Sequence, residues 1–165
     1  ASPAARVRAA PPRGKRTAPV GLELQVMRLL VAHPVLASDL DQEALDAMLH
    51  FVPDSAVMLM QLVVAGQEMG AQASFAMLSE HLRAGGPEFD SMIAEVAAEP
   101  ESDRDAARLE LAGAVRQTKM KVLKAELDQL AASGMGHDEA RTRYRELTLK
   151  QEQLRREAEA EIGRR

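Results

Sequence analysis

Four histidines are the side chains in this sequence most able to bind a metal ion or to carry a proton. They are His33, His50, His81 and His137. No two of them are four residues apart, the His-x-x-x-His spacing that places two ligands on one face of a helix. The chain also lacks cysteine, so no thiolate can complete a metal site. We therefore predict no metal site.

Motifs for acid–base or phosphate chemistry are equally weak. Glu80-His81 joins a carboxylate to an imidazole as a general base would, but any charged helix offers such neighbours. His137-Asp138-Glu139 stands where a helix should begin, and there such residues complement the helix dipole. The segments AGQEMG (65–70) and RAGGPE (83–88) lack the lysine and the preceding strand of a phosphate-binding loop. We predict no catalytic residue, no cofactor and no small-molecule substrate, so this chain is not expected to be an enzyme.

The composition favours a helical protein. Hydrophobic residues make up 46% of the chain, but only three Phe, one Tyr and no Trp are among them, while Met occurs nine times. A core of Leu, Ala, Val and Met suits helix packing better than sheets, which prefer β-branched and aromatic residues. No apolar run reaches the roughly 18 residues of a membrane span. We predict an all-α protein without membrane contact, and the absence of cysteine fits a reducing, cytoplasmic compartment.

Charge divides the chain into three segments. Residues 1–20 contain five basic residues, no acidic residue and four prolines, which predicts a disordered basic Pro/Ala-rich linker that contacts nucleic acid weakly if at all. Residues 21–100 contain two basic and twelve acidic residues, a net charge of −10. Residues 101–165 contain fourteen basic and thirteen acidic residues and are close to neutral. The chain begins with Ala rather than Met, so we expect a piece of a longer protein.

The second segment, residues 21–100, reads as a compact five- to six-helix bundle. Apolar residues at helical spacing, separated by Pro and Gly, predict helices at 22–33, 41–49, 55–69, 72–84 and 88–99. Apolar residues surround the helix 55–69, which predicts a central, buried element. Pro34 should end the first helix, because a proline pushes the preceding residue out of the helical conformation. We expect the His33 ring to meet the free carbonyls at that helix end.

The third segment, residues 101–163, reads as a long helix followed by an antiparallel helical hairpin. Ser102, three residues before Asp105, has the spacing of a helix N-terminal capping box, and the helical pattern then runs to Ser133 with Gly113 as its one weak point. Apolar residues then repeat every three or four positions on both sides of a Gly-containing turn at 133–138. The first set is Met120, Leu123, Leu127 and Leu130, and the second is Ala140, Tyr144, Leu147, Gln151, Leu154 and Ala158. Two matching seams joined by a short turn predict the hairpin.

The apolar residues of such a hairpin need a further surface to bury them, because two helices of about 20 residues cannot enclose a core by themselves. Leu149, Met135 and Ile162 are apolar although they lie outside the seams. A partner protein, the bundle itself or a second copy of the chain could supply the cover, and we favour a partner. The residues predicted to bind it are Leu127, Leu130, Met135, Tyr144, Leu147, Gln151, Leu154 and Arg155.

Two stretches carry a family resemblance. The run VMRLLVAHPVLAS (26–38) resembles the opening helix of the C-terminal helicase-binding domain of bacterial DNA primase, where an R-x-L-L-x-x-P-x-L-A pattern is typical. The end, ELDQLAASGMGHDEARTRYRELTLKQEQLRR (126–156), resembles the terminal hairpin of that family. The order of bundle, long helix and hairpin also agrees, so the resemblance covers residues 22–160.

The resemblance implies a function. Members of this family dock on the N-terminal domains of the hexameric replicative DNA helicase, mainly through the terminal hairpin, and so couple RNA primer synthesis to fork unwinding in the bacterial cytoplasm. The parent chain would be a DNA primase, whose catalytic motifs have no counterpart here. Two alternatives stay open: an N-terminal-type helical domain of the helicase itself, which has a similar fold, or a self-associating helical scaffold.

Overall fold

A computed structural model describes residues 21–164, and helices are the only regular secondary structure among them, with no strand. The helices are α1 (Leu22–Ala32), α2 (Gln42–Met48), α3 (Pro53–Met69), α4 (Phe75–Gly85), α5 (Asp90–Ala98), α6 (Arg104–Ala132) and α7 (Asp138–Ile162). Two short 3₁₀ helices, η1 (Pro34–Asp39) and η2 (Gly70–Gln72), complete the set. The all-α prediction is confirmed. The predicted linker, residues 1–20, lies outside the described residues.

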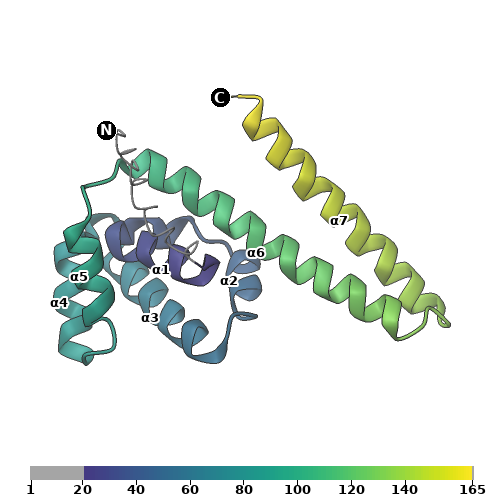
Figure 1. Ribbon diagram of the computed structural model, residues 1–165, viewed down its shortest axis with the longest axis horizontal. Helices are drawn as coiled ribbons and strands as arrows, with labels where there is room; N and C mark the ends of the chain where they lie inside the picture. The colour runs from purple at the N-terminus through teal and green to yellow at the C-terminus, as the bar shows by residue number, and fades with distance from the viewer. Residues whose placement is uncertain (1–20, 165) are drawn as a thin grey trace, which may run out of the picture.

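Helices α1 to α5 form a bundle in which α1 packs against α3, α4 and α5, and α6 extends from this bundle to a tip where α7 turns back (Figure 1). The first half of α6 belongs to the bundle, because Ala107, Leu111 and Ala114 are buried in the same apolar cluster as α1. The second half extends away from the bundle and packs with α7 through a separate apolar cluster. Its first residues still contact α2, through the ion pair of Lys119 with Glu43. No helix of the described chain is both long enough and apolar enough to cross a membrane.

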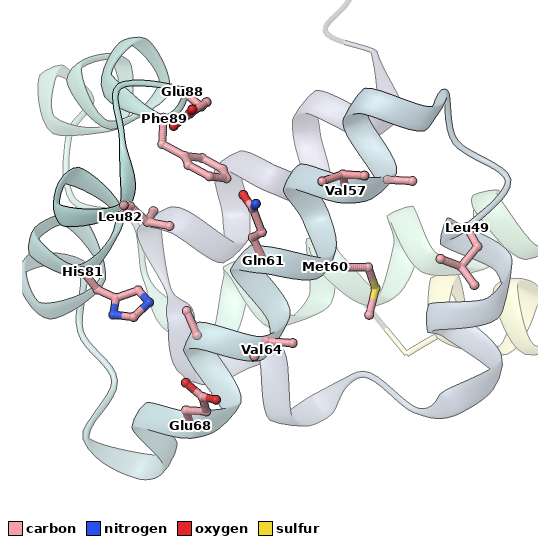
Figure 2. Close-up of a pocket in the computed structure, with 13 residues that line it drawn as sticks. Leu49, Val57, Met60, Gln61, Val64, Glu68, His81, Leu82, Glu88 and Phe89 are labelled. Carbon is pink, nitrogen blue, oxygen red and sulfur yellow. The ribbon is translucent and has the colours of Figure 1, made fainter.

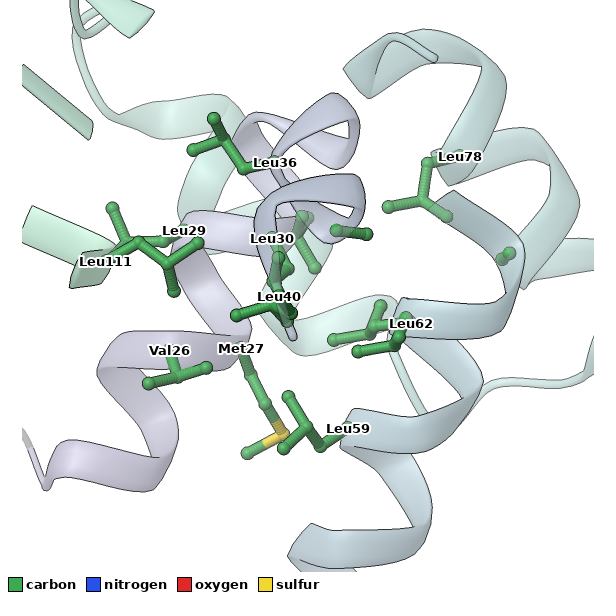
Figure 3. Packing of buried hydrophobic residues seen from close by; sticks show 14 of the residues in the cluster. Val26, Met27, Leu29, Leu30, Leu36, Leu40, Leu59, Leu62, Leu78 and Leu111 are labelled. Atoms are coloured by element: carbon green, nitrogen blue, oxygen red, sulfur yellow. The ribbon is translucent and has the colours of Figure 1, made fainter. Parts of the chain in front are cut away.

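The bundle core is aliphatic, as the composition requires. Leu30, in the last turn of α1, is fully buried, together with Leu36 of η1 and Leu59 of α3 (Figure 3). Apolar residues at every third or fourth position give α1 its buried side. This packing fixes the bundle as the base from which the long helix α6 projects.

The His33-Pro34 pair sits where α1 ends and η1 begins. Pro34 is the first residue of η1, where its missing N–H costs nothing. The η1 segment packs closely on α3 at Gly66, and a Cβ added there would lie 2.7 Å from the Pro34 carbonyl oxygen. The expectation that His33 meets the helix-end carbonyls is wrong, because its Nε2 lies 2.8 Å from Ser102 Oγ. His33 therefore joins the end of α1 to the segment that precedes α6.

The N-terminal cap of α6 differs from the prediction, whereas the continuous helical pattern agrees with it. Ser102 does not cap the helix; Asp103 does, and its carboxylate accepts a hydrogen bond from the Ala106 N–H at 3.0 Å. The Ser102 side chain is instead engaged with His33. The helix runs without a break through Gly113. The long helix is therefore one rigid arm from the bundle to the hairpin tip.

Helix α3 is less enclosed than its sequence suggested. Leu59, Leu62 and Val63 are buried, but Val57 and Val64 on the other side remain 59% and 47% exposed. The prediction of a helix buried on all sides is therefore wrong, because within residues 21–164 no element covers this side. The uncovered side is part of an apolar groove on the bundle.

Candidate functional site

The candidate site is the helical hairpin formed by the second half of α6 and by α7 (Figure 1). Four leucines, Leu123, Leu127, Leu147 and Leu154, are buried between the two helices. The turn between the helices uses Gly134 with φ +78°, a left-handed conformation that glycine adopts without strain. Near the tip, the Arg143 guanidinium is 2.8 Å from the Glu126 carboxylate and ties α7 to α6.

The predicted partner-binding residues fall into three groups in this hairpin. Leu127, Leu147 and Leu154 are buried in the seam. Leu130, Tyr144 and Gln151 are half-buried along its edge. Met135 at the tip and Arg155 on α7 are exposed. Direct contact of these residues with a partner stays a prediction, and for the three seam leucines it would require the hairpin to open.

The seam leucines therefore hold the two helices together, and a different face of α7 is free to meet a partner. Leu149 lies two residues after Leu147, which places it about 200° around the helix at 3.6 residues per turn. Its side chain is 71% exposed, the second-highest exposure among the large apolar residues of the described chain. Arg145, Glu152 and Arg156 are close to it on the same side by helical spacing.

Leu149 was not among the predicted partner-binding residues, although a signal for it was present. The seam pattern of α7 repeats every three or four residues, and Leu149 is an apolar residue off that pattern. An apolar residue off the seam takes no part in closing the hairpin, so it is a candidate for a contact outside it. A prediction based on the seam pattern alone selects residues that are buried between the two helices, and it does not include Leu149.

Ion pairs fix the position of the hairpin relative to the bundle. The Glu43 carboxylate of α2 lies 3.2 Å from Lys119 Nζ of α6 and also pairs with Lys150 of α7. Further along, Arg116 of α6 donates a hydrogen bond of 2.6 Å to Glu161 of α7. Glu43 thus connects three helices, and it does so at the point where α6 leaves the bundle.

The two lysines affect the acidity of this carboxyl. The hydrogen bond from Lys150, and to a smaller extent that from Lys119, holds the pKa of Glu43 below its ordinary value, although partial burial opposes this shift. A carboxyl whose pKa is lower in the folded protein stabilises the fold above its unfolded pKa of about 4.3. That contribution disappears as the pH falls through the lower, folded pKa.

We expect Glu43→Gln to lower the free energy of unfolding at neutral pH by no more than about 1 kcal/mol, because the side chain is 48% exposed and water screens the pairs. The difference between the two proteins should vanish as the pH falls below the folded pKa of Glu43, where the wild-type carboxyl is also neutral. Urea unfolding of both proteins over a pH series measures this. Glu80→Gln, whose carboxylate makes no ion pair with the described residues, is the matched control and should show no such pH dependence.

The polar side chains of the hairpin are mostly engaged with one another or exposed to water. Within residues 21–164, no group of three or more His, Asp or Glu side chains is placed to hold a metal ion. The crevice between α2 and the hairpin is lined by charged residues such as Glu43, Glu126 and Lys150, which are engaged in the ion pairs described above or at the tip. What the arrangement presents is a long, braced pair of helices with an apolar residue on its outer face.

Comparison with known proteins gives one match. A family model described as DNA primase DnaG DnaB-binding matches residues 23–147, about three quarters of the chain. The match covers the bundle, α6 and the first part of α7, and it ends at Leu147 of the hairpin seam. No curated protein and no solved structure matches the chain.

Proposed function

Because the chain belongs to the family of DnaB-binding domains of the DNA primase DnaG, we propose that it docks on the N-terminal domains of the hexameric helicase through the outer face of α7 and the hairpin tip. As a member of that family it is the helicase-binding module of a primase.

The observation that carries the proposal is the exposure of Leu149 on a helix pair whose own core is complete. The four seam leucines are already buried, so Leu149 has no part in holding the hairpin together. Arginine is enriched among the residues that contribute most of the binding energy at protein interfaces. Arg145 and Arg156 flank Leu149, and Met135 adds a second apolar side chain at the tip.

The ion pairs between the hairpin and the bundle also support docking through the outer face of α7. The ion pairs of Glu43 with Lys119 and Lys150 limit how far the hairpin can swing against the bundle. Less freedom is then lost when a partner binds, and a preorganised surface binds more tightly for the same contacts. Docking through the outer face also leaves the seam intact, so that the hairpin need not open.

Docking of this kind would hold primer synthesis next to the unwinding fork. The module itself would carry no catalytic residue and would need no cofactor, its contribution being to fix the position of the primase on the helicase. Nucleic-acid contact would be weak and limited to the basic residues 1–20, since the acidic surface of residues 21–100 repels phosphate. Family membership favours this reading over a helicase N-terminal domain.

We expect Leu149→Asp to weaken binding to the helicase N-terminal domains by about tenfold or more, which corresponds to the loss of about 1.4 kcal/mol at an interface anchor. Calorimetric titration of the full chain into the isolated N-terminal domains measures it. The fold should be unaffected, because the side chain is already in water.

Leu109→Asp is the matched control, since Leu109 is also apolar, 48% exposed and helical, but lies on the part of α6 that packs with the bundle. It should bind as the wild type does. Equal losses for the two variants, or wild-type affinity for Leu149→Asp, would show that the outer face of α7 is not the docking surface.

A further inference from the structure

A second surface of the molecule lies on the bundle, far along the chain from the hairpin. A groove with a cavity volume of about 690 Å³ runs between α3, α4 and the start of α5 (Figure 2). Its floor and walls are apolar and include Val57, Met60 and Val64 of α3, Leu82 of α4 and Phe89. The volume lies within the range of about 300–1,000 Å³ that is typical of ligand sites. Large apolar side chains stay exposed here because no described element covers the groove.

The polar residues around the groove determine what kind of occupant it fits. Glu68 lies at one end and Glu88 at the other, and both are exposed (Figure 2). No lysine or arginine is among the residues that line the groove. An acidic or phosphorylated segment would therefore meet like charge, whereas a segment that combines basic with small apolar side chains would find partners for both.

Residues 1–20 of the same chain have that chemistry. Five basic residues and no acidic residue occur in this segment, together with prolines, alanines, Val7 and Val20. With a net charge of −10 on residues 21–100, the two parts attract each other. Each proline has a fixed φ, so a proline-containing segment loses less conformational freedom when it docks.

The start of the described chain lies next to the groove. Glu23, in the first turn of α1, accepts a hydrogen bond of 3.2 Å from the N–H of Val52, the residue before α3. Ala56 and Val57, one turn further into α3, line the groove. An extended segment of 20 residues reaches up to about 66 Å, and the 17 residues of α3 extend over about 25 Å. The segment is therefore long enough to run along the whole groove.

We propose that residues 1–20 dock in the groove between α3 and α4, with small apolar side chains on Val57, Met60 and Val64 and basic side chains at Glu68 and Glu88. Because the segment is covalently attached, its effective concentration at the groove is in the millimolar range, and weak contacts suffice. This inference concerns the bundle and does not depend on how the hairpin binds the helicase.

The absence of cysteine makes a direct test possible, because one introduced cysteine can carry a spin label alone. Val7→Cys in the full chain places the label in the basic segment. We expect the methyl NMR signals of Val57, Met60 and Val64 to lose intensity with the oxidised label and to regain it after reduction. The methyl signals of Leu149 on the hairpin are the internal reference and should not change. Adding Glu68→Gln and Glu88→Gln, two exposed positions, should reduce the loss, as should high salt.

Two results would overturn the proposal. One is the absence of any loss, or an equal loss at Leu149, which would mean that the segment has no preferred position on the bundle. The other is a loss that depends on protein concentration. It would appear in isotope-labelled chains that carry no spin label when they are mixed with spin-labelled chains. That result would assign the groove to the segment of a second copy.

Discussion

Leu147→Asp is expected to separate α7 from α6 and to abolish helicase binding. Leu147 is 3% exposed in the seam, and loss of a buried leucine alone costs about 2–5 kcal/mol. The substitution also places a carboxylate between apolar side chains, which adds a desolvation cost. Only four leucines are buried in the hairpin, so it has little reserve to absorb such a loss. Circular dichroism should show fewer helical residues, while the bundle still unfolds cooperatively.

Leu149→Asp is the natural control for this variant, because the same change is made two residues away on the same helix. Its side chain faces water, and the helical signal should stay at the wild-type level. Both variants should lose helicase affinity, the first through the fold of the hairpin and the second through its surface. If Leu147→Asp kept full helicity and wild-type affinity, the leucine seam would not be what holds the hairpin in its binding shape.

Gly66→Ala is expected to lower the free energy of unfolding by about 1–3 kcal/mol, the usual cost of overpacking a core. A Cβ at this position would lie 2.7 Å from the Pro34 carbonyl oxygen and 2.8 Å from the Ala37 Cβ. Neither obstacle can rotate away, so η1 would have to move off α3. Urea unfolding followed by circular dichroism measures the change.

Gly113→Ala, the same substitution in α6, should act in the opposite direction. A Cβ there meets nothing within 4 Å, and alanine favours a helix over glycine by about 1 kcal/mol. The pair separates the effect of close packing from that of helix propensity. A stabilised Gly66→Ala protein would contradict the close approach of η1 and α3.

The parts of the fold that follow from local spacing could be predicted from the sequence. Leu123 and Leu127 of α6 and Leu147 and Leu154 of α7 recur every three or four residues, and a two-helix seam is the arrangement that buries such residues. The Gly134 turn leaves only a short connection, which makes the helices antiparallel. The hairpin therefore follows from the sequence because neighbouring segments make it.

What depends on the packing of distant segments could not be predicted in this way. The apolar residues of α3 indicate burial but do not say whether another helix is available to cover each side, and Val57 and Val64 stay exposed. His33 meets Ser102, a residue 69 positions away, which no local helix-end rule can anticipate. Once Ser102 is engaged there, Asp103 becomes the cap of α6. Local spacing also does not say which face of the hairpin meets a partner, so the predicted contact residues stay a prediction.

Site-directed photo-crosslinking tests the account most directly. A photoreactive group on Leu149→Cys, in a chain without other cysteines, should crosslink to the N-terminal domains of the helicase, and mass spectrometry identifies the joined peptides. The same group on Leu109→Cys should give no such product. Crosslinks that form from position 109 but not from 149, or that join Leu149→Cys to the motor domain, would contradict docking through the outer face of α7.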